Sequence, residues 1–174
     1  GVHWIRRILD LASVYDGDGP LEGSIVDVQC FGPKAPLGNV PHEDTSVIVA
    51  RHRSGLVSRL VHSWAIPWRF IVANSSKLVC EEGALYFDAR GIFGRAYGPE
   101  GQRLLWPSIS DAGGFGAMWQ DFIECLERGR APELTLEHIL LDFAYMDAAY
   151  RSRLSGKAET FDLSALHGAA AAKE

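Results

Sequence analysis

Residues 44–64 read D-T-S-V-I-V-A-R-H-R-S-G-L-V-S-R-L-V-H-S-W, and this stretch decides the fold. Its two halves, 44–52 and 56–64, are rich in β-branched residues, which are typical of strands. The three residues between them, 53–55, include a glycine and have the length of a tight hairpin turn. The stretch therefore predicts two antiparallel strands joined directly.

The hairpin register separates the histidines within it. We expect His52 to lie opposite Leu56, and His62 to lie opposite Ser46. The two imidazoles are then about six residues, or roughly 20 Å, apart along the ladder. Ligands of one metal ion lie within about 2 Å of it. The even spacing of His42, His52 and His62 therefore does not predict a metal site.

Further strands are predicted on both sides of this hairpin. Alternating or continuous apolar segments are separated by short clusters of Gly, Pro, Asn and Ser. Regularly spaced strands with short turns predict one antiparallel, hairpin-rich sheet. The additional strands are expected at residues 24–31, 69–73, 77–80, 84–88, 95–97 and 102–106, with an edge strand at 160–163.

Helical periodicity appears only near the two ends of the chain. Apolar residues recur every three or four positions in residues 1–12, in a segment from 113 that stops at Gly129, and in 135–154. No capping residue precedes the first helix, so we expect the chain to start within a longer protein. The residues expected to face inward are Ile5, Ile8, Leu9 and Ala12 in the first helix, Phe115, Met118, Trp119, Phe122, Ile123 and Leu126 in the second, and Leu136, Ile139, Leu140 and Phe143 in the third.

This order of elements predicts an α+β fold, with helices packed on one face of an open, largely antiparallel sheet. The other face also needs cover, because the strands are apolar on both alternations. Ile48 and Ala50 alternate with Val47 and Val49. Such a sheet predicts a partner surface. The alternative is a strongly curled sheet that covers itself.

Composition limits the class of protein. The chain has 174 residues, which suits one domain over residues 1–165 with a frayed tail at 166–174. A formal charge of −5, with Lys and Arg scattered, argues against a nucleic-acid partner. No apolar run is long enough for a membrane span, and no signal peptide is apparent. We therefore expect a cytoplasmic protein without a membrane partner.

The cysteines and glycines do not indicate a cofactor site of their own. Cys30, Cys80 and Cys125 are an odd number without a C-x-x-C pair, so free, buried and reduced thiols are expected. Residues 113–116 read G-G-F-G before a helix. They lack the Lys and Ser or Thr of a P-loop, and a flexible entry to the helix is the simpler interpretation. No Gly-x-Gly-x-x-Gly occurs either.

Two features could carry chemistry. Trp64, Trp68 and Arg69 cluster around a proline between two strands, where indole rings and a guanidinium could line a sugar-like ligand. Core tryptophans beside a surface arginine are an equally good interpretation. His3 stands in the first turn of the first helix, where an imidazole could accept and release a proton. A purely structural histidine remains the alternative.

The chain resembles the C-terminal domain of the Gfo/Idh/MocA family, the glucose–fructose oxidoreductase and inositol dehydrogenase group. The resemblance covers nearly the whole chain and rests on the order of several short motifs. They are Gly1-Val2-His3 before an amphipathic helix and a large antiparallel sheet, the helix beginning at Gly114-Phe115, the run from Glu124 to Pro132, and Ala148-Ala149-Tyr150-Arg151-Ser152 followed by Gly156.

The resemblance implies specific roles. Family members carry a separate Rossmann domain that binds NAD or NADP and supplies a lysine from a Glu-Lys-Pro motif. A second motif, Asp-x-Gly-x-His, would map its glycine and histidine onto Gly1 and His3, with its aspartate two residues before Gly1. The histidine would assist proton transfer. Arg6 departs from the acid or amide common at its position, and could instead contact an anionic substrate.

The resemblance therefore implies the substrate-binding and oligomerisation domain of an NAD(P)-dependent oxidoreductase, which would form a homo-oligomer through its open sheet face. The intact enzyme would transfer hydride between the nicotinamide and a hydroxyl carbon of a sugar, polyol or related compound. The chain lacks the cofactor domain, so by itself it is expected to bind no nicotinamide and to be inactive. The alternative is a non-catalytic sheet-based oligomerisation or binding module that shares only the architecture.

Overall fold

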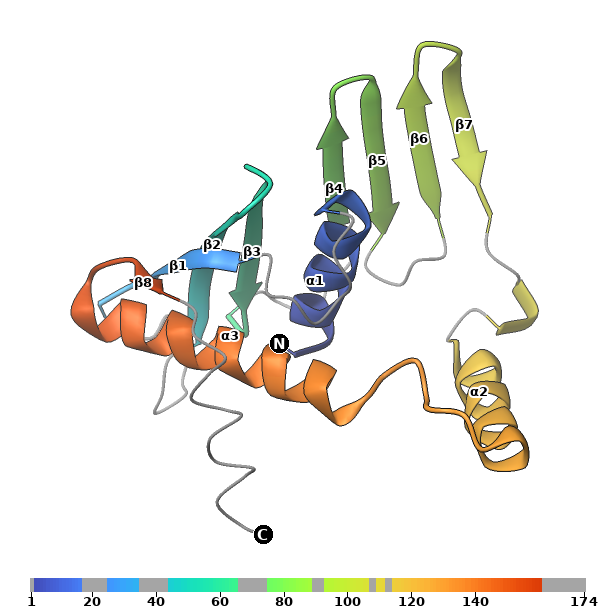
Figure 1. The fold of residues 1–174 in the computed structure, drawn as a ribbon. Coiled ribbons are helices and arrows are strands. Elements are labelled where there is room, and N and C mark those ends of the chain that lie inside the picture. Colours follow the sequence, from blue (N-terminus) through green and yellow to red (C-terminus); the bar gives the residue numbers. More distant parts are fainter. Residues whose placement is uncertain are drawn as a thin grey trace, which may run out of the picture. The chain divides into compact units, whose positions relative to one another are not determined.

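A computed structural model describes residues 2–16, 25–34, 44–65, 75–88, 93–106, 109–111 and 114–160 (Figure 1). The chain divides into two compact units. The first combines residues 1–65 with 134–174, and the second comprises residues 66–133. The predicted α+β class with open antiparallel sheets is confirmed. The predicted strand at 69–73 and the tail at 166–174 lie outside the described residues.

The first unit has one four-stranded antiparallel sheet and two helices. The strand order is β3-β2-β1-β8, so the C-terminal strand pairs with the first strand of the chain. The described part of the predicted edge strand 160–163 is the single residue Thr160. The elements are α1 (Val2–Asp16), β1 (Ile25–Phe31), β2 (Thr45–His52), β3 (Val57–Ser63), α3 (Leu136–Ser155) and β8 (Glu159–Thr160).

The central hairpin has the register that the sequence predicts. Ser46 pairs with His62 across β2 and β3. The amide N–H of His52 donates a hydrogen bond of 2.8 Å to the carbonyl of Leu56, which closes the turn. Gly55 in that turn has a φ of 90°, a conformation that favours glycine. Turn chemistry and the alternating pattern thus set this register together.

The core of the first unit lies between its two helices and one face of the sheet. Three of the four residues predicted to face inward from α1, namely Ile5, Leu9 and Ala12, are buried. The sheet contributes alternate residues of β1 and β2, which point to the helices because strand side chains alternate between faces. Those residues are Val28, Cys30, Ile48 and Ala50.

The inward face of α3 differs from the prediction. Leu136 and Phe143, which we expected inside, are more than half exposed. The helix is apolar on two sides, and the small residues Ala148 and Ala149 decide which side packs, because they let the helix backbone approach the sheet closely. The buried face consists of His138, Leu141, Asp142, Tyr145, Ala148, Ala149 and Ser152.

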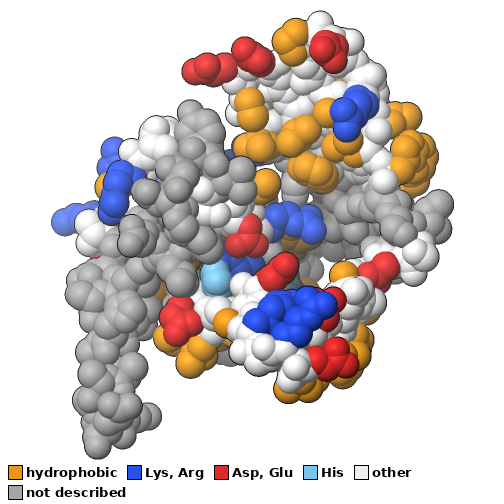
Figure 2. Space-filling model, turned by 45° about the vertical axis from the view of Figure 1, so that its right-hand side comes forward, with side chains coloured by type: hydrophobic (Ala, Val, Ile, Leu, Met, Phe, Trp, Pro, Cys, Tyr) orange, Lys and Arg blue, Asp and Glu red, His pale blue; other side chains and the backbone are white. Residues whose placement is uncertain are grey.

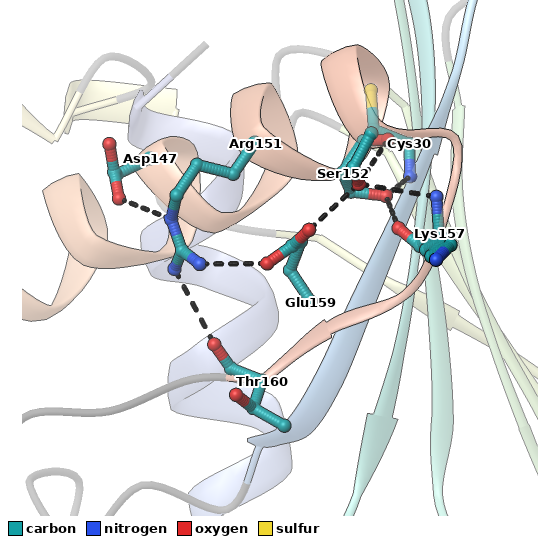
Figure 3. Close-up of polar contacts among 8 residues, drawn as sticks. Cys30, Asp147, Arg151, Ser152, Lys157, Glu159 and Thr160 are labelled. Atoms are coloured by element: carbon teal, nitrogen blue, oxygen red, sulfur yellow. Dashed lines mark hydrogen bonds and ion pairs between the residues drawn. The ribbon is translucent and has the colours of Figure 1, made fainter.

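A buried serine ties the end of α3 to the sheet (Figure 3). The hydroxyl of Ser152 accepts a hydrogen bond of 2.9 Å from the amide of Cys30 and donates one of 2.6 Å to the carbonyl of Lys157. The short strand β8 pairs only with residues 27 and 28 of β1. Ser152 therefore satisfies a backbone donor that β8 does not reach, which is costly to leave buried and unpaired.

The opposite face of this sheet is open within the first unit. It carries the second apolar alternation of β2, including Val47 and Val49, beside the exposed residues Val57, Val61 and Phe31. The only pair of opposite charges described on it is Arg51 with Asp27. The predicted apolarity of both faces, with helices on one, is thus confirmed.

The second unit contains another antiparallel sheet, with the strand order β4-β5-β6-β7. The described strands therefore form two four-stranded sheets instead of the single sheet expected. A hairpin turn determines only the pairing of the two strands that it joins. Among the described residues, no backbone hydrogen-bond ladder pairs β3 with β4, so the two sets of strands stay separate. The elements are β4 (Ser75–Cys80), β5 (Gly83–Asp88), β6 (Gly94–Gly98), β7 (Gly101–Leu105), a short 3₁₀ helix η2 (Ile109–Asp111) and α2 (Phe115–Arg128).

Apolar side chains are prominent on the surface of the second unit, and Figure 2 shows hydrophobic residues gathered over its sheet. Of the predicted buried thiols, Cys30 is buried, Cys80 is exposed and Cys125 is partly exposed, and none of the three forms a disulfide. No side chain of α2 is buried in the described structure. The predicted apolar stripe of α2 therefore forms as a helical face but is not covered.

The glycine-rich entry to α2 is already occupied by a side chain. The carboxylate of Asp111 accepts hydrogen bonds from the amides of Gly116, at 2.9 Å, and Ala117, at 2.7 Å. These two bonds lower the pKa of Asp111. Gly114 has a φ of 70°, so it bends the chain into the helix. Because a carboxylate caps these donors, they are not available as a phosphate cradle.

Candidate functional site

The first turn of α1 presents His3 to solvent. Its side chain is exposed, whereas Ile5 on the other side of the turn is buried in the core. The helix itself is held by its buried stripe, and it packs against α3 and β3. The imidazole is therefore accessible to a ligand, while its backbone is anchored from behind.

Arg6 follows His3 by one turn and connects α1 to α3. Its Nε donates a hydrogen bond of 2.8 Å to Oδ1 of Asp10, and one Nη donates to the carbonyl of His138 at 3.2 Å. The same Nη lies 3.3 Å from the carboxylate of Asp142. The guanidinium, whose side chain is 12% exposed, thus bridges two helices. Its predicted contact with an anionic substrate stays a prediction.

Asp142 is a buried carboxylate, which is uncommon in proteins. The residue is 2% exposed, on the face of α3 that packs inward. Burial raises the pKa of Asp142 to about 6; the positive charges of Arg6 and His3 act against this, and Asp10 adds to it. At neutral pH the group is mostly ionised and depends on Arg6 for compensation. One of its oxygens, Oδ1, makes no hydrogen bond in the described structure.

His138 forms the other wall of this cluster. Its Nδ1 accepts a hydrogen bond of 3.1 Å from the amide of Thr135, which caps the start of α3. An accepting Nδ1 carries no proton, so the ring is neutral in this arrangement. Burial, followed by the charge of Arg6, lowers the pKa of His138, which favours the same neutral form.

The predicted aromatic wall is described only in part. Trp64 is 76% exposed just beyond the end of β3, and its ring meets that of His62 edge to face at 5.6 Å. Burial lowers the pKa of His62. Trp68 and Arg69 lie outside the described residues. Whether they line a ligand with Trp64 stays a prediction.

The sequence predicts His3 and Arg6 as site residues, which stays a prediction, and it does not single out Asp142 or His138. His3 and Arg6 were apparent from the helix that they share. Asp142 and His138 were not, because they lie far along the chain on a helix whose inward face was assigned to other residues. A possible signal was the presence of an acid and an imidazole four residues apart on one helix, flanked by the apolar residues Leu141 and Tyr145.

Two classes of site find no support in the described residues. They contain no group of three His, Cys, Asp or Glu side chains that could hold a metal ion. No helix among them is long and apolar enough to cross a membrane. The described residues around α1 instead combine the accessible imidazole of His3 with the buried ion pair of Arg6 and Asp142. An accessible imidazole can exchange a proton with a bound hydroxyl.

Comparison with known proteins finds similarity at the level of fold. No protein-family model matches the chain, and no curated protein sequence matches it. Many solved structures do match. An aldose–aldose oxidoreductase from Caulobacter crescentus, solved with glycerol, is 19% identical and has a TM-score of 0.69 over 89% of this chain and 45% of its own length.

Two further structures give the same result. An oxidoreductase from Agrobacterium radiobacter, solved with NAD+, L-tartaric acid and magnesium, is 19% identical with a TM-score of 0.64 over 88% of this chain and 46% of its own. An oxidoreductase domain protein from Kribbella flavida is 18% identical with a TM-score of 0.69 over 90% and 48%. This chain shares the fold of about half of each oxidoreductase.

Proposed function

We propose that this chain is the substrate-binding and oligomerisation domain of a cytoplasmic NAD(P)-dependent oxidoreductase of the Gfo/Idh/MocA type. Its substrate would be a sugar, a polyol or a related hydroxy compound. The observation that carries the proposal is the fold match, which takes in about nine-tenths of this chain and slightly less than half of each oxidoreductase. That ratio fits a domain that works together with a second, cofactor-binding domain.

The proposal assigns proton transfer to His3, whose side chain is exposed. Oxidising a carbinol removes a hydride from carbon and a proton from oxygen. The nicotinamide, held by the other domain, supplies the hydride acceptor. The exposed imidazole of His3 accepts the hydroxyl proton in that direction and returns it in the reverse direction. Trp64 is exposed and, with Trp68 and Arg69, is proposed to contact the substrate.

Arg6 is less suited to substrate contact than it appears from the sequence. Three acceptors of the protein already surround its guanidinium. Its remaining Nη2 is buried without a hydrogen-bond partner in the described structure, so it does not reach solvent. We therefore propose that Arg6 affects the substrate site mainly through the placement of α1.

The function is tested by adding the sequence encoded upstream of Gly1. We expect the longer protein to contain an Asp two residues before Gly1, a Glu-Lys-Pro motif and a glycine-rich βαβ unit. It should quench or shift NADH or NADPH fluorescence saturably and should oxidise members of a polyol and aldose panel. The chain of 174 residues alone should do neither. A longer protein without nicotinamide binding would support the non-catalytic assembly module instead.

We also expect the chain to self-associate through an open sheet face. The outward face of the first sheet carries an apolar cluster of Phe31, Val47 and Val61, and the second sheet exposes Tyr86 and Tyr97, whose rings meet edge to face at 5.5 Å. Sedimentation should give a species larger than the 19.1 kDa monomer. Changing Val57 and Val61 together to Lys should shift it toward the monomer, because charge at a desolvated face opposes association. A wild-type chain that sediments only as a monomer contradicts this.

A further inference from the structure

The ion pair between Arg6 and Asp142 starts one helical turn after the exposed histidine. His3 and Arg6 are three residues apart, so they lie on neighbouring turns of α1 and close to one face. Within the part of the chain that the structure describes, Arg6 in turn has three polar contacts, all with groups that fix the helix: Asp10 one turn on, the carbonyl of His138, and Asp142. Two of these three acceptors belong to α3.

Among the described residues, few other contacts stabilise the start of α1. Its buried residues begin at Ile5, and the side chains before it, His3 and Trp4, are exposed or half-buried. A helix N-terminus also lacks the intrahelical hydrogen bonds of its first amides, so it frays easily. The contacts of Arg6 therefore supply the polar anchor nearest to the turn that carries His3.

We propose that Asp142 is a positioning residue for His3: from α3 it holds Arg6, and through Arg6 it fixes the first turn of α1. Asp142 does not touch the substrate in this scheme. The part of the proposal that concerns catalysis rests on the proposed function. The part that concerns the anchoring of α1 does not, and it can be measured on this chain alone.

The first test is amide hydrogen exchange on the chain. In Asp142→Ala, the amides of residues 6–10 should exchange on the order of 10-fold faster, because the acceptor for Arg6 is gone. The amides of residues 145–152 in α3 should not change. Asp147→Ala is the matched control, since this aspartate is exposed on the same helix and pairs with Arg151. Unchanged exchange in Asp142→Ala, or an equal effect in Asp147→Ala, overturns the proposal.

A second variant covers the case in which Asp142→Ala does not fold. Arg6→Lys keeps the positive charge but loses the planar fork that reaches several acceptors at once. It should also speed exchange at residues 6–10. Asp142→Asn keeps an acceptor oxygen of the same shape, so it should leave α1 protected. Loss of protection in Asp142→Asn alone, with Arg6→Lys unaffected, would contradict an anchor that acts through Arg6.

The pH dependence gives a readout that packing alone would not change. Burial holds the pKa of Asp142 at about 6, above its ordinary value of 3.8, and the positive charge of Arg6 acts in the opposite direction by favouring the ionised carboxylate. The contact with Arg6 is therefore strongest when Asp142 is ionised, and it weakens as pH falls through about 6. Protection of α1 should therefore rise from pH 5 to pH 7 by more in the wild type than in Asp142→Asn.

Other titratable groups are common to both proteins in that comparison. Four charged groups shift the pKa of Asp142 or of its neighbour His138: His3, Arg6 and Asp10 on α1, and Glu137 on α3. Because His138 has a lowered pKa, its titration also makes protection rise with pH, and it does so in both proteins. The difference between the wild type and Asp142→Asn isolates the carboxyl. Identical pH profiles in the two proteins would overturn the proposal.

Kinetics of the intact enzyme separate this proposal from the proposed function. Asp142→Ala should lower kcat on the order of 10-fold with little change in KM, because substrate binds but His3 is misplaced. If His3→Ala abolishes turnover and Asp142→Ala does not change it, the positioning role is wrong. If neither variant changes turnover but Asp142→Ala still speeds amide exchange in α1, then Asp142 does anchor α1, and His3 does not have the role that the proposed function gives it.

Discussion

Replacing His3 with alanine in the intact oxidoreductase that we propose is expected to lower kcat by about 100- to 10,000-fold, the range for loss of a general acid or base. The change should fall on kcat more than on KM. His3 is exposed and makes no described hydrogen bond to the fold, so alanine removes a proton acceptor without leaving a cavity. The measurement is steady-state turnover with NAD or NADP and the best substrate of the panel.

Arg7→Ala is the control for this substitution. Arg7 is exposed on the same helix, and its guanidinium lies 5.0 Å from the ring centroid of Trp4, so it is a surface contact unrelated to the site. We expect less than a threefold change in kcat. A His3→Ala enzyme with near wild-type turnover would show that the histidine is structural and would remove the proton-transfer role from the proposed function.

Replacing Tyr145 with alanine is expected to lower the free energy of unfolding by about 3–5 kcal/mol. Tyr145 is 0% exposed and lies within the core cluster with Val28 and Leu141. Alanine would leave a cavity between α3 and the sheet that neighbouring side chains could fill only in part. Urea denaturation of the chain, followed by circular dichroism, gives the difference directly.

Tyr145→Phe distinguishes packing from hydrogen bonding. Burial raises the pKa of Tyr145 to about 12, so the hydroxyl is un-ionised at any physiological pH. That hydroxyl lies beside Ser58 but has no hydrogen-bond geometry in the described structure. Phenylalanine should therefore change the stability by less than about 1 kcal/mol. A loss as large as that of alanine would mean that the hydroxyl, rather than the ring, holds this core.

Much of the local structure follows from local signals. The hairpin of β2 and β3 has its predicted register because a short turn fixes which residues face each other, and Gly55 permits that turn. The buried stripe of α1 follows from helical periodicity alone. The positions of Gly129 and Gly156 at the ends of α2 and α3 follow from the left-handed conformation that both adopt.

The sequence was less successful in predicting which face of a helix packs against the rest of the chain. The largest apolar side chains of α3, such as Leu136 and Phe143, are exposed, while Ala148 and Ala149 pack inward. Size favours burial only where the opposing surface leaves room, and the sequence does not describe that surface. For the same reason the pattern of α2 predicted an amphipathic helix correctly but could not show whether its stripe is covered.

The sequence by itself determined the element types, the antiparallel hairpins and the place of His3 on the first helix, because these depend on neighbours within a few residues. Only the tertiary structure decided that Arg6 meets Asp142 and that Ser152 satisfies the amide of Cys30. These contacts join residues more than a hundred positions apart. They form because buried charges and backbone amides must find partners, and the fold determines which partners are near.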